Sequence, residues 1–113
     1  MAFSSNCTIF SSNDLKIEND VIIGAYSYLL SGGEYEPASP EKFVDQSGMK
    51  SAGPLSIGSN TWIGTRATVL DAASIGAHCV IGAGAVVNKP VEADSIAVGV
   101  PAKKVKSLEK TAS

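Results

Sequence analysis

Residues 57–87 read IGSNTW IGTRAT VLDAAS IGAHCV IGAGAV V, a stretch that repeats its pattern every six residues. The first position of each repeat is a branched aliphatic residue, giving the series Ile57, Ile63, Val69, Ile75, Ile81 and Val87. An amphipathic helix would space its apolar residues three or four apart, and a half-buried strand would space them two apart, so neither explains this period. A fixed six-residue period is typical of a repeat architecture in which each unit stacks on its neighbours.

Two further positions of the repeat are restricted. The position after the aliphatic residue is glycine at Gly58, Gly64, Gly76 and Gly82, and the fourth position after it is small at Thr61, Ala67, Ala73, Cys79 and Ala85. This pattern predicts a parallel β-helix of triangular section, in which each unit forms one short strand and one corner, and three units form a coil. The aliphatic and small side chains then point inwards, and glycine suits the tight turn, where a Cβ would crowd the chain.

The same pattern begins near the N-terminus and is interrupted once. It runs through Phe3, Ile9 and Leu15 and, after a slip of two residues, through Ile17, Ile23 and Leu29. From Ser31 to Pro54 the chain has no period and is rich in proline and glycine, which predicts a loop extruded from the prism. Long loops in compact domains are usually functional, although this one could simply cover a coil edge or a neighbouring subunit.

We therefore expect one all-β domain over residues 1–113. Its first coils lie at 3–32, the extruded loop at 33–54, the later coils at 55–98 and a short C-terminal tail at 99–113. The two cysteines, Cys7 and Cys79, both fall on the small interior position, so we interpret them as packed residues rather than nucleophiles, metal ligands or disulfide partners.

Composition excludes several classes of function. A net charge of −2 and a pI near 5.2 leave no basic stripe for nucleic acid. No apolar stretch approaches the ~18 residues of a membrane span, and residues 1–8 lack the layout of a signal peptide. We therefore expect a cytoplasmic protein that binds neither nucleic acid nor membrane.

Three stretches carry a resemblance to a known family: PLSIGSNTWIG (54–64), IGAHCVIGAGAVVNK (75–89) and AVGVPAK (97–103). They resemble the C-terminal half of hexapeptide-repeat acyltransferases, above all the maltose, galactoside, serine, xenobiotic and polysaccharide O-acetyltransferases. The resemblance implies that the β-helix is left-handed, although parallel crossovers are otherwise almost always right-handed. It also implies a homotrimer that binds acetyl-CoA as co-substrate in a cleft between adjacent prisms.

In that family a histidine on the extruded loop removes the proton from the acceptor hydroxyl or amine, and here Glu34 stands in its place. Glu34 could be a substitute base with a pKa raised by burial, a polar contact in a site that only binds a ligand, or solvated surface. His78 is the second candidate base, although its position in the repeat predicts an outward corner or interface residue. The zinc carbonic anhydrases of this fold need three histidines, and this chain has one, so we expect no metal.

The resemblance also implies a set of acetyl-CoA contacts. The backbone around Ala83 and Gly84 would approach the pantetheine arm, Asn88 and Lys89 stand where the family has Thr-Lys, and Ala102, Lys103 and Lys104 close the motif near the CoA phosphates. Trp62, the single tryptophan, would lie near the cleft or pack in the trimer. For the lysines near the C-terminus, the alternative is a solvated turn or helix.

Two functions follow as hypotheses. The first is an acyl-CoA-dependent, acetyl-type transferase that acts on a hydroxyl or amine of a sugar or small metabolite. The second is a non-catalytic hexapeptide-repeat protein that binds a ligand or partner in the same cleft. The missing loop histidine is the feature that separates them.

Overall fold

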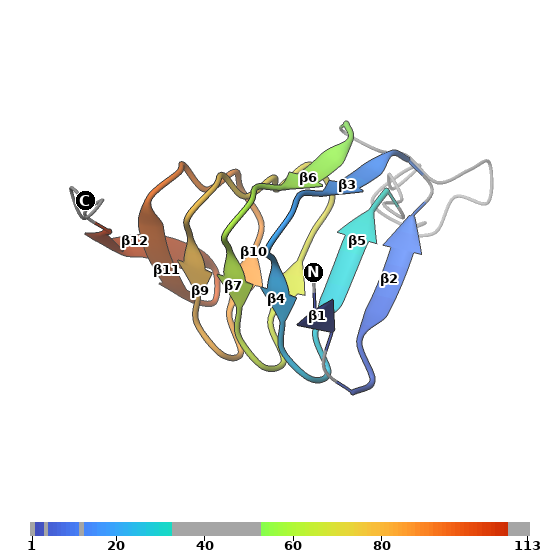
Figure 1. The fold of residues 1–113 in the computed structure, drawn as a ribbon, viewed down its shortest axis with the longest axis horizontal. Coiled ribbons are helices and arrows are strands. Elements are labelled where there is room, and N and C mark those ends of the chain that lie inside the picture. Colours follow the sequence, from blue (N-terminus) through green and yellow to red (C-terminus); the bar gives the residue numbers. More distant parts are fainter. Residues whose placement is uncertain (1, 4, 12, 33–52, 109–113) are drawn as a thin grey trace, which may run out of the picture.

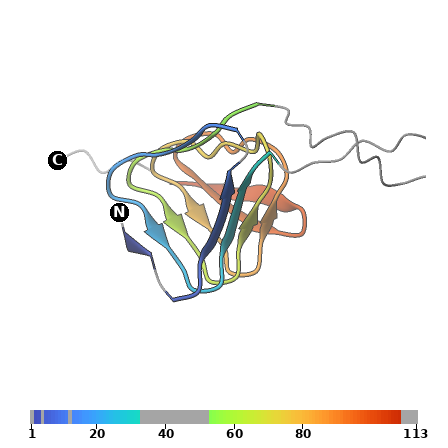
Figure 2. The same cartoon turned by 90° about the vertical axis from the view of Figure 1, so that its right-hand side faces the viewer.

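The chain winds into a three-sided prism whose coils follow one another from the N-terminal to the C-terminal end (Figures 1 and 2). The computed structural model describes residues 2–3, 5–11, 13–32 and 53–108. Glu34 and most of the predicted loop lie outside the described residues. Within them the structure contains strands and no helix, so no helix there could cross a membrane.

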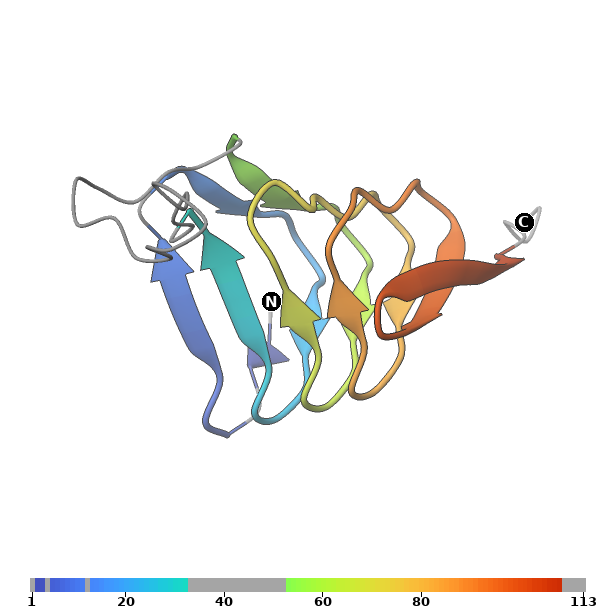
Figure 3. The ribbon, with the colours of Figure 1, turned by 180° about the vertical axis from the view of Figure 1, so that it is seen from behind.

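The three faces of the prism are three sheets, parallel throughout except where β12 pairs with β11. The first joins β1 (Ala2–Phe3), β4 (Ile22–Ile23), β7 (Trp62–Ile63), β9 (Val80–Ile81), β11 (Ser95–Gly99) and β12 (Ala102–Ser107). The second, shown from behind in Figure 3, joins β2 (Thr8–Ser11), β5 (Tyr28–Ser31), β8 (Thr68–Val69) and β10 (Val86–Val87). The third pairs β3 (Leu15–Ile17) with β6 (Leu55–Ile57) and continues through single bridges to Ile75 and Val91.

The predicted interior columns are confirmed. The six aliphatic residues from Ile57 to Val87 are at most 2% exposed, and so are the five small residues from Thr61 to Ala85. The strand register stacks them, so that Ile23 pairs with Ile63 and Ile63 with Ile81. Each fully buried aliphatic side chain contributes about 1.5–3 kcal/mol to folding.

The glycines of the repeat are required by stacking rather than by backbone conformation. A Cβ on Gly58 would lie 2.3 Å from the backbone nitrogen of Ala77 in the next coil, and one on Gly64 would lie 2.7 Å from that of Ala83. The left-handed residue of each corner comes two positions later, as at Asn60, Arg66, Ala72 and His78. The sequence prediction of crowding was therefore right, but the neighbouring coil causes it.

The two ends of the prism differ from the repeat. At the N-terminal end Phe3 and Ile9 are 43% and 42% exposed, because no further coil covers their outer side. At the other end, the first half of the tail predicted over 99–113 contains a strand: β12 turns back and pairs antiparallel with β11, with Gly99 opposite Ala102.

Candidate functional site

The predicted coenzyme contacts lie at two different corners of the prism. Ala83 and Gly84 form the corner between β9 and β10, where the amide of Gly84 donates a 2.9 Å hydrogen bond to the carbonyl of Thr65 in the coil before. Both residues are exposed, and a Cβ built on Gly84 would meet nothing within 4 Å. This corner therefore offers open backbone to a ligand. Asn88 and Lys89 follow β10 at the next corner and are also exposed.

One open hollow, which we call the lysine hollow, joins Lys89 to the C-terminal strand. It measures about 260 Å³ and is lined by Lys89, Pro90, Val91, Glu92, Ala102 and Lys104. Lys104 also forms an ion pair with Glu92. Lys103 and Asn88 do not line this hollow; on β12 successive side chains point to opposite sides. The structure thus brings together three of the predicted coenzyme residues: Lys89, Ala102 and Lys104.

Trp62 and His78 share a second hollow, which we call the tryptophan hollow. It measures about 330 Å³ and is lined by Asp20, Ile22, Asn60, Thr61, Trp62, His78, Cys79, Val80 and Leu108. Trp62 points outwards from β7, as predicted, and is 56% exposed. In the strand register it lies between Ile22 and Val80, so one wall of the hollow is apolar.

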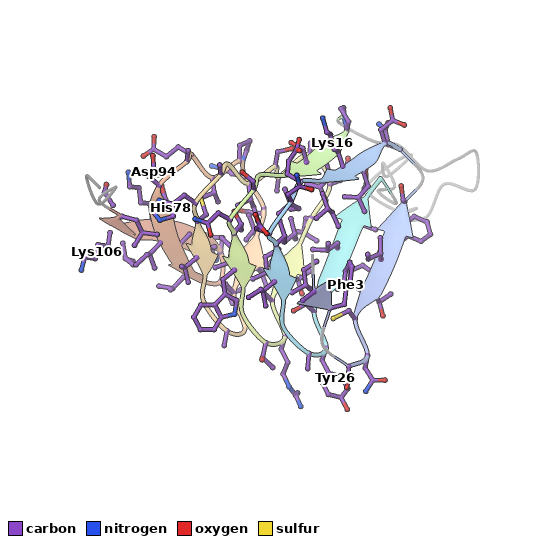
Figure 4. All side chains as sticks on the ribbon, in the orientation of Figure 1. Phe3, Lys16, Tyr26, His78, Asp94 and Lys106 are labelled. Carbon is purple, nitrogen blue, oxygen red and sulfur yellow. The ribbon has the colours of Figure 1, made fainter. Side chains whose placement is uncertain are left out.

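His78 lies at a corner and is paired with a residue that the sequence analysis missed. Its Nδ1 lies 2.8 Å from Oδ1 of Asp94, and both side chains are about one-third exposed. Figure 4 shows the two side by side at the C-terminal end of one edge, with Tyr26 at the opposite edge. The period of the sequence gave no signal for this pair, because it predicts an offset of 18 residues between coils, as from Ile57 to Ile75, whereas the last coil has an offset of 16, from Ile75 to Val91 and from His78 to Asp94.

Asp71 is the second polar residue that the sequence analysis missed. It is only 6% exposed, and its Oδ1 accepts a 2.6 Å hydrogen bond from the amide of Gly32. Gly32 is the last described residue before the stretch 33–52. Asp71 therefore holds the backbone just after β5, at the last described residue before that stretch.

The cysteines are packed as expected. Neither is in a disulfide, and Cys79 is buried and donates to the carbonyl of Glu92 at 3.1 Å. Burial raises the pKa of the Cys79 thiol above its usual value, which disfavours the thiolate that a nucleophile or metal ligand needs. Among the described residues there is no group of three His, Cys, Asp or Glu side chains that could hold a metal ion.

Comparisons with known proteins agree with this architecture. Residues 54–89 match the family described as bacterial transferase hexapeptide (six repeats). A Staphylococcus aureus (strain MRSA252) protein provisionally named an acetyltransferase is 37% identical over 112 residues, covering 85% of this chain and 56% of its own length. The solved structure of galactoside acetyltransferase in complex with coenzyme A is 30% identical, with a TM-score of 0.80 over 92% of this chain and 50% of that one.

A maltose O-acetyltransferase from Clostridium difficile 630 shares the fold at 23% identity, with a TM-score of 0.67 over 96% of this chain and 71% of that one. The protein is therefore a left-handed parallel β-helix of hexapeptide repeats, and its resemblance to the maltose and galactoside acetyltransferases is confirmed. The chain spans about half the length of the S. aureus relative and of galactoside acetyltransferase.

Proposed function

We propose that this chain is an acyl-CoA-dependent transferase, of the acetyl type, that acts on a hydroxyl or amine of a sugar or small metabolite. The observation that carries the proposal is the match to galactoside acetyltransferase in complex with coenzyme A, which extends over 92% of the chain at 30% identity. The S. aureus relative supports the same function, since it is also named as an acetyltransferase.

The exposed residues at the two corners fit a CoA ester as substrate. At the corner of Ala83 and Gly84 the backbone is open, so an extended pantetheine arm can approach its amides and carbonyls. Lys89 and Lys104 line the lysine hollow, and ammonium groups there can pair with phosphate oxygens. Lys104 would exchange its present partner, Glu92, for the ligand. In the reaction, backbone amides would stabilise the oxyanion that forms at the thioester carbonyl.

We also propose that the working unit is a homotrimer with its clefts between prisms. Several large apolar side chains are exposed on the single chain, including Ile22, Trp62, Val100 and Val105. Apolar surface of this kind is typical of subunit interfaces. The assignment of Glu34 as a base or polar contact stays a prediction, because Glu34 lies outside the described residues.

Calorimetry with CoA tests the binding half of the proposal. We expect CoA binding that weakens with salt, and a clear loss of affinity in Lys89→Ala and Lys104→Ala. Lys16→Ala is the matched control, because it removes the same charge from Lys16 of β3, which is exposed and pairs with Glu18 just beyond that strand. Equal CoA affinity in all three variants would show that the lysine hollow is not part of the CoA site.

Release of free CoA from acetyl-CoA tests the catalytic half. The assay should be run with sugars, amino sugars and serine as acceptors, and we expect acceptor-dependent release by the wild-type protein. CoA binding without transfer to any acceptor would favour the alternative, a non-catalytic ligand-binding protein.

A further inference from the structure

We propose that the tryptophan hollow is part of a binding site for a linear polyamine, which lies along one edge of the prism from Asp20 to Asp94. This edge is opposite the edge that carries Tyr26 (Figure 4). The corner of Gly84 belongs to the Tyr26 edge, because the amides of Arg66 and Gly84 donate there to carbonyls of the coil before. The polyamine site is therefore separate from the proposed CoA corner, and it does not depend on acyl transfer.

The edge carries one polar side chain from each of four successive coils, which we call the corner column. All four residues have a left-handed backbone, with φ between 56° and 59°, and they are Asp20, Asn60, His78 and Asp94. The amides of the last three donate to carbonyls of the coil before at 3.2, 2.9 and 3.0 Å. Equivalent atoms of neighbouring coils lie about 4.8 Å apart, so the corner column spans roughly 14 Å.

Every member of the corner column offers a hydrogen-bond acceptor. Asp20 and Asp94 place carboxylates at its two ends, and Asn60 has an amide oxygen. Nδ1 of His78 lies 2.8 Å from Oδ1 of Asp94, so in the neutral imidazole the proton is on Nδ1 and Nε2 is the acceptor. Among the described residues no lysine or arginine lines the hollow, so a cationic ligand meets no competing side chain there.

An apolar stripe runs beside the corner column on the first sheet. Its members follow the corner residues by two positions and pair in the strand register, Ile22 with Trp62, Trp62 with Val80, and Val80 with Ile96. Ile22 and Trp62 are 52% and 56% exposed, and both line the hollow together with Val80. Methylene groups of a ligand can therefore lie on this stripe while its nitrogens reach the corners.

The repeat of the coils matches the spacing of nitrogens in a polyamine. An extended chain advances about 1.2 Å per bond, so two nitrogens joined by three methylenes are about 4.8 Å apart, which is also the distance between coils. Terminal ammonium groups can pair with the carboxylates of Asp20 and Asp94, and the nitrogens between them can donate to Asn60 and His78. An ammonium beside Trp62 also gains from the negative face of the indole.

Fluorescence measures binding at this site directly, because Trp62 is the only tryptophan of the chain. We expect spermine to change the emission saturably and to bind about tenfold more tightly than putrescine, whose two nitrogens reach only two corners. Added salt should weaken the binding. Magnesium chloride at equal ionic strength is the control for charge alone, and an equal response to Mg²⁺ would overturn the assignment to a polyamine.

Two variants test the ends of the corner column. Asp20→Asn and Asp94→Asn each remove one carboxylate and introduce a residue that tolerates the left-handed backbone. Each should weaken spermine binding about tenfold, and the double variant should lose the saturable response. Asp20→Asn keeps the test decisive if Asp94→Asn, which changes the bond to His78, does not fold.

Asp14→Asn is the matched control, because Asp14 is an exposed carboxylate that lines neither hollow. It should bind spermine as the wild type does. Equal spermine affinity in Asp20→Asn and Asp14→Asn would overturn the proposal.

Calorimetry with spermine tests the apolar stripe without using the indole as the reporter. Trp62→Phe keeps an aromatic face and should retain most of the affinity, whereas Trp62→Leu should weaken binding roughly threefold to fivefold. Wild-type affinity in Trp62→Leu would overturn the placement of the ligand on the stripe.

Exchanging the variants between the two ligands separates this site from the proposed CoA site. We expect Asp20→Asn to bind CoA as the wild type does, and Lys89→Ala to bind spermine as the wild type does. Loss of spermine binding in Lys89→Ala would overturn the separate site. A wild-type protein that binds CoA but does not respond to spermine would overturn the polyamine inference and leave the proposed function standing. Spermine binding without CoA binding would do the reverse.

Discussion

The amide nitrogen of Gly32 lies 2.6 Å from Oδ1 of Asp71, a carboxylate that is only 6% exposed. This bond ties the end of β5 to the corner after β8. Leaving a buried amide without a hydrogen-bond acceptor lowers the stability of the fold by roughly the free energy needed to remove that amide from water. The bond therefore anchors the second coil to the third.

Asp71→Ala should lower the free energy of unfolding by about 1.5–3 kcal/mol, because it leaves the amide of Gly32 unpaired. Asp71→Asn should lower it less, since its carbonyl oxygen can still accept the bond. Urea unfolding followed by circular dichroism measures both. Asp14→Ala is the control, because Asp14 is exposed and its removal should change the value by less than about 0.5 kcal/mol. An equal effect of Asp71→Ala and Asp14→Ala would contradict the anchoring role.

The glycines of the repeat give a second prediction. Gly58→Ala places a Cβ 2.3 Å from the backbone of the next coil, so the coils must separate locally, at a cost of at least about 1–3 kcal/mol. Gly84→Ala meets no atom within 4 Å and carries only the strain of φ 72°, which is roughly 1 kcal/mol. Thermal melting should therefore rank Gly58→Ala as the more destabilised variant, and the reverse order would show that corner conformation, not stacking, requires these glycines.

Much of the fold could be predicted from the sequence because one physical rule sets it. Every unit must bury one aliphatic and one small side chain, so the period of six gives the interior directly, as at Ile63 and Ala67. The rule fails where a coil lacks a neighbour, as at Phe3 and Ile9, and where the register slips, as between Val87 and Val91. The six-residue period does not extend through β12, so the antiparallel pairing of β12 with β11 could not be predicted from it.

The candidate site was harder to predict, because it depends on contacts between coils. The sequence analysis singled out His78 and Trp62 as separate candidates. That they line one hollow, and that His78 bonds to Asp94, could be known only from how the last coil stacks on the coil before it. Lys103 and Lys104 are equivalent in the sequence motif, yet only Lys104 lines the lysine hollow, because neighbouring side chains of a strand alternate.

The buried thiol of Cys79 gives a third prediction. Because burial raises its pKa, the folded state favours the protonated thiol, and this contribution to stability is present below the unfolded pKa of about 8.5. This contribution is lost as the pH rises towards the pKa of the thiol in the folded state, so the free energy of unfolding should fall above about pH 8.5. Cys79→Ser should weaken this fall.

The same burial should slow the reaction of Cys79 with a thiol reagent. At pH 8, the reagent should modify half-buried Cys7 well before Cys79; equal rates would contradict the packed role of Cys79.

The assembly gives the last prediction, and it concerns the hairpin of β11 and β12. Val100 and Val105 are 73% and 62% exposed, the highest values among the large apolar side chains described. If they pack against another copy of the chain, light scattering should give about three times the chain mass of 11.6 kDa. Val105→Lys should then shift the protein towards the monomer, because a charge would be buried at the interface. Lys106→Ala, on the next residue of β12, is the control and should remain trimeric. A wild-type monomer at micromolar concentration would contradict the trimer. A trimer that survives Val105→Lys would show that the interface lies on another face, and Ile22 and Trp62 are then the next residues to change.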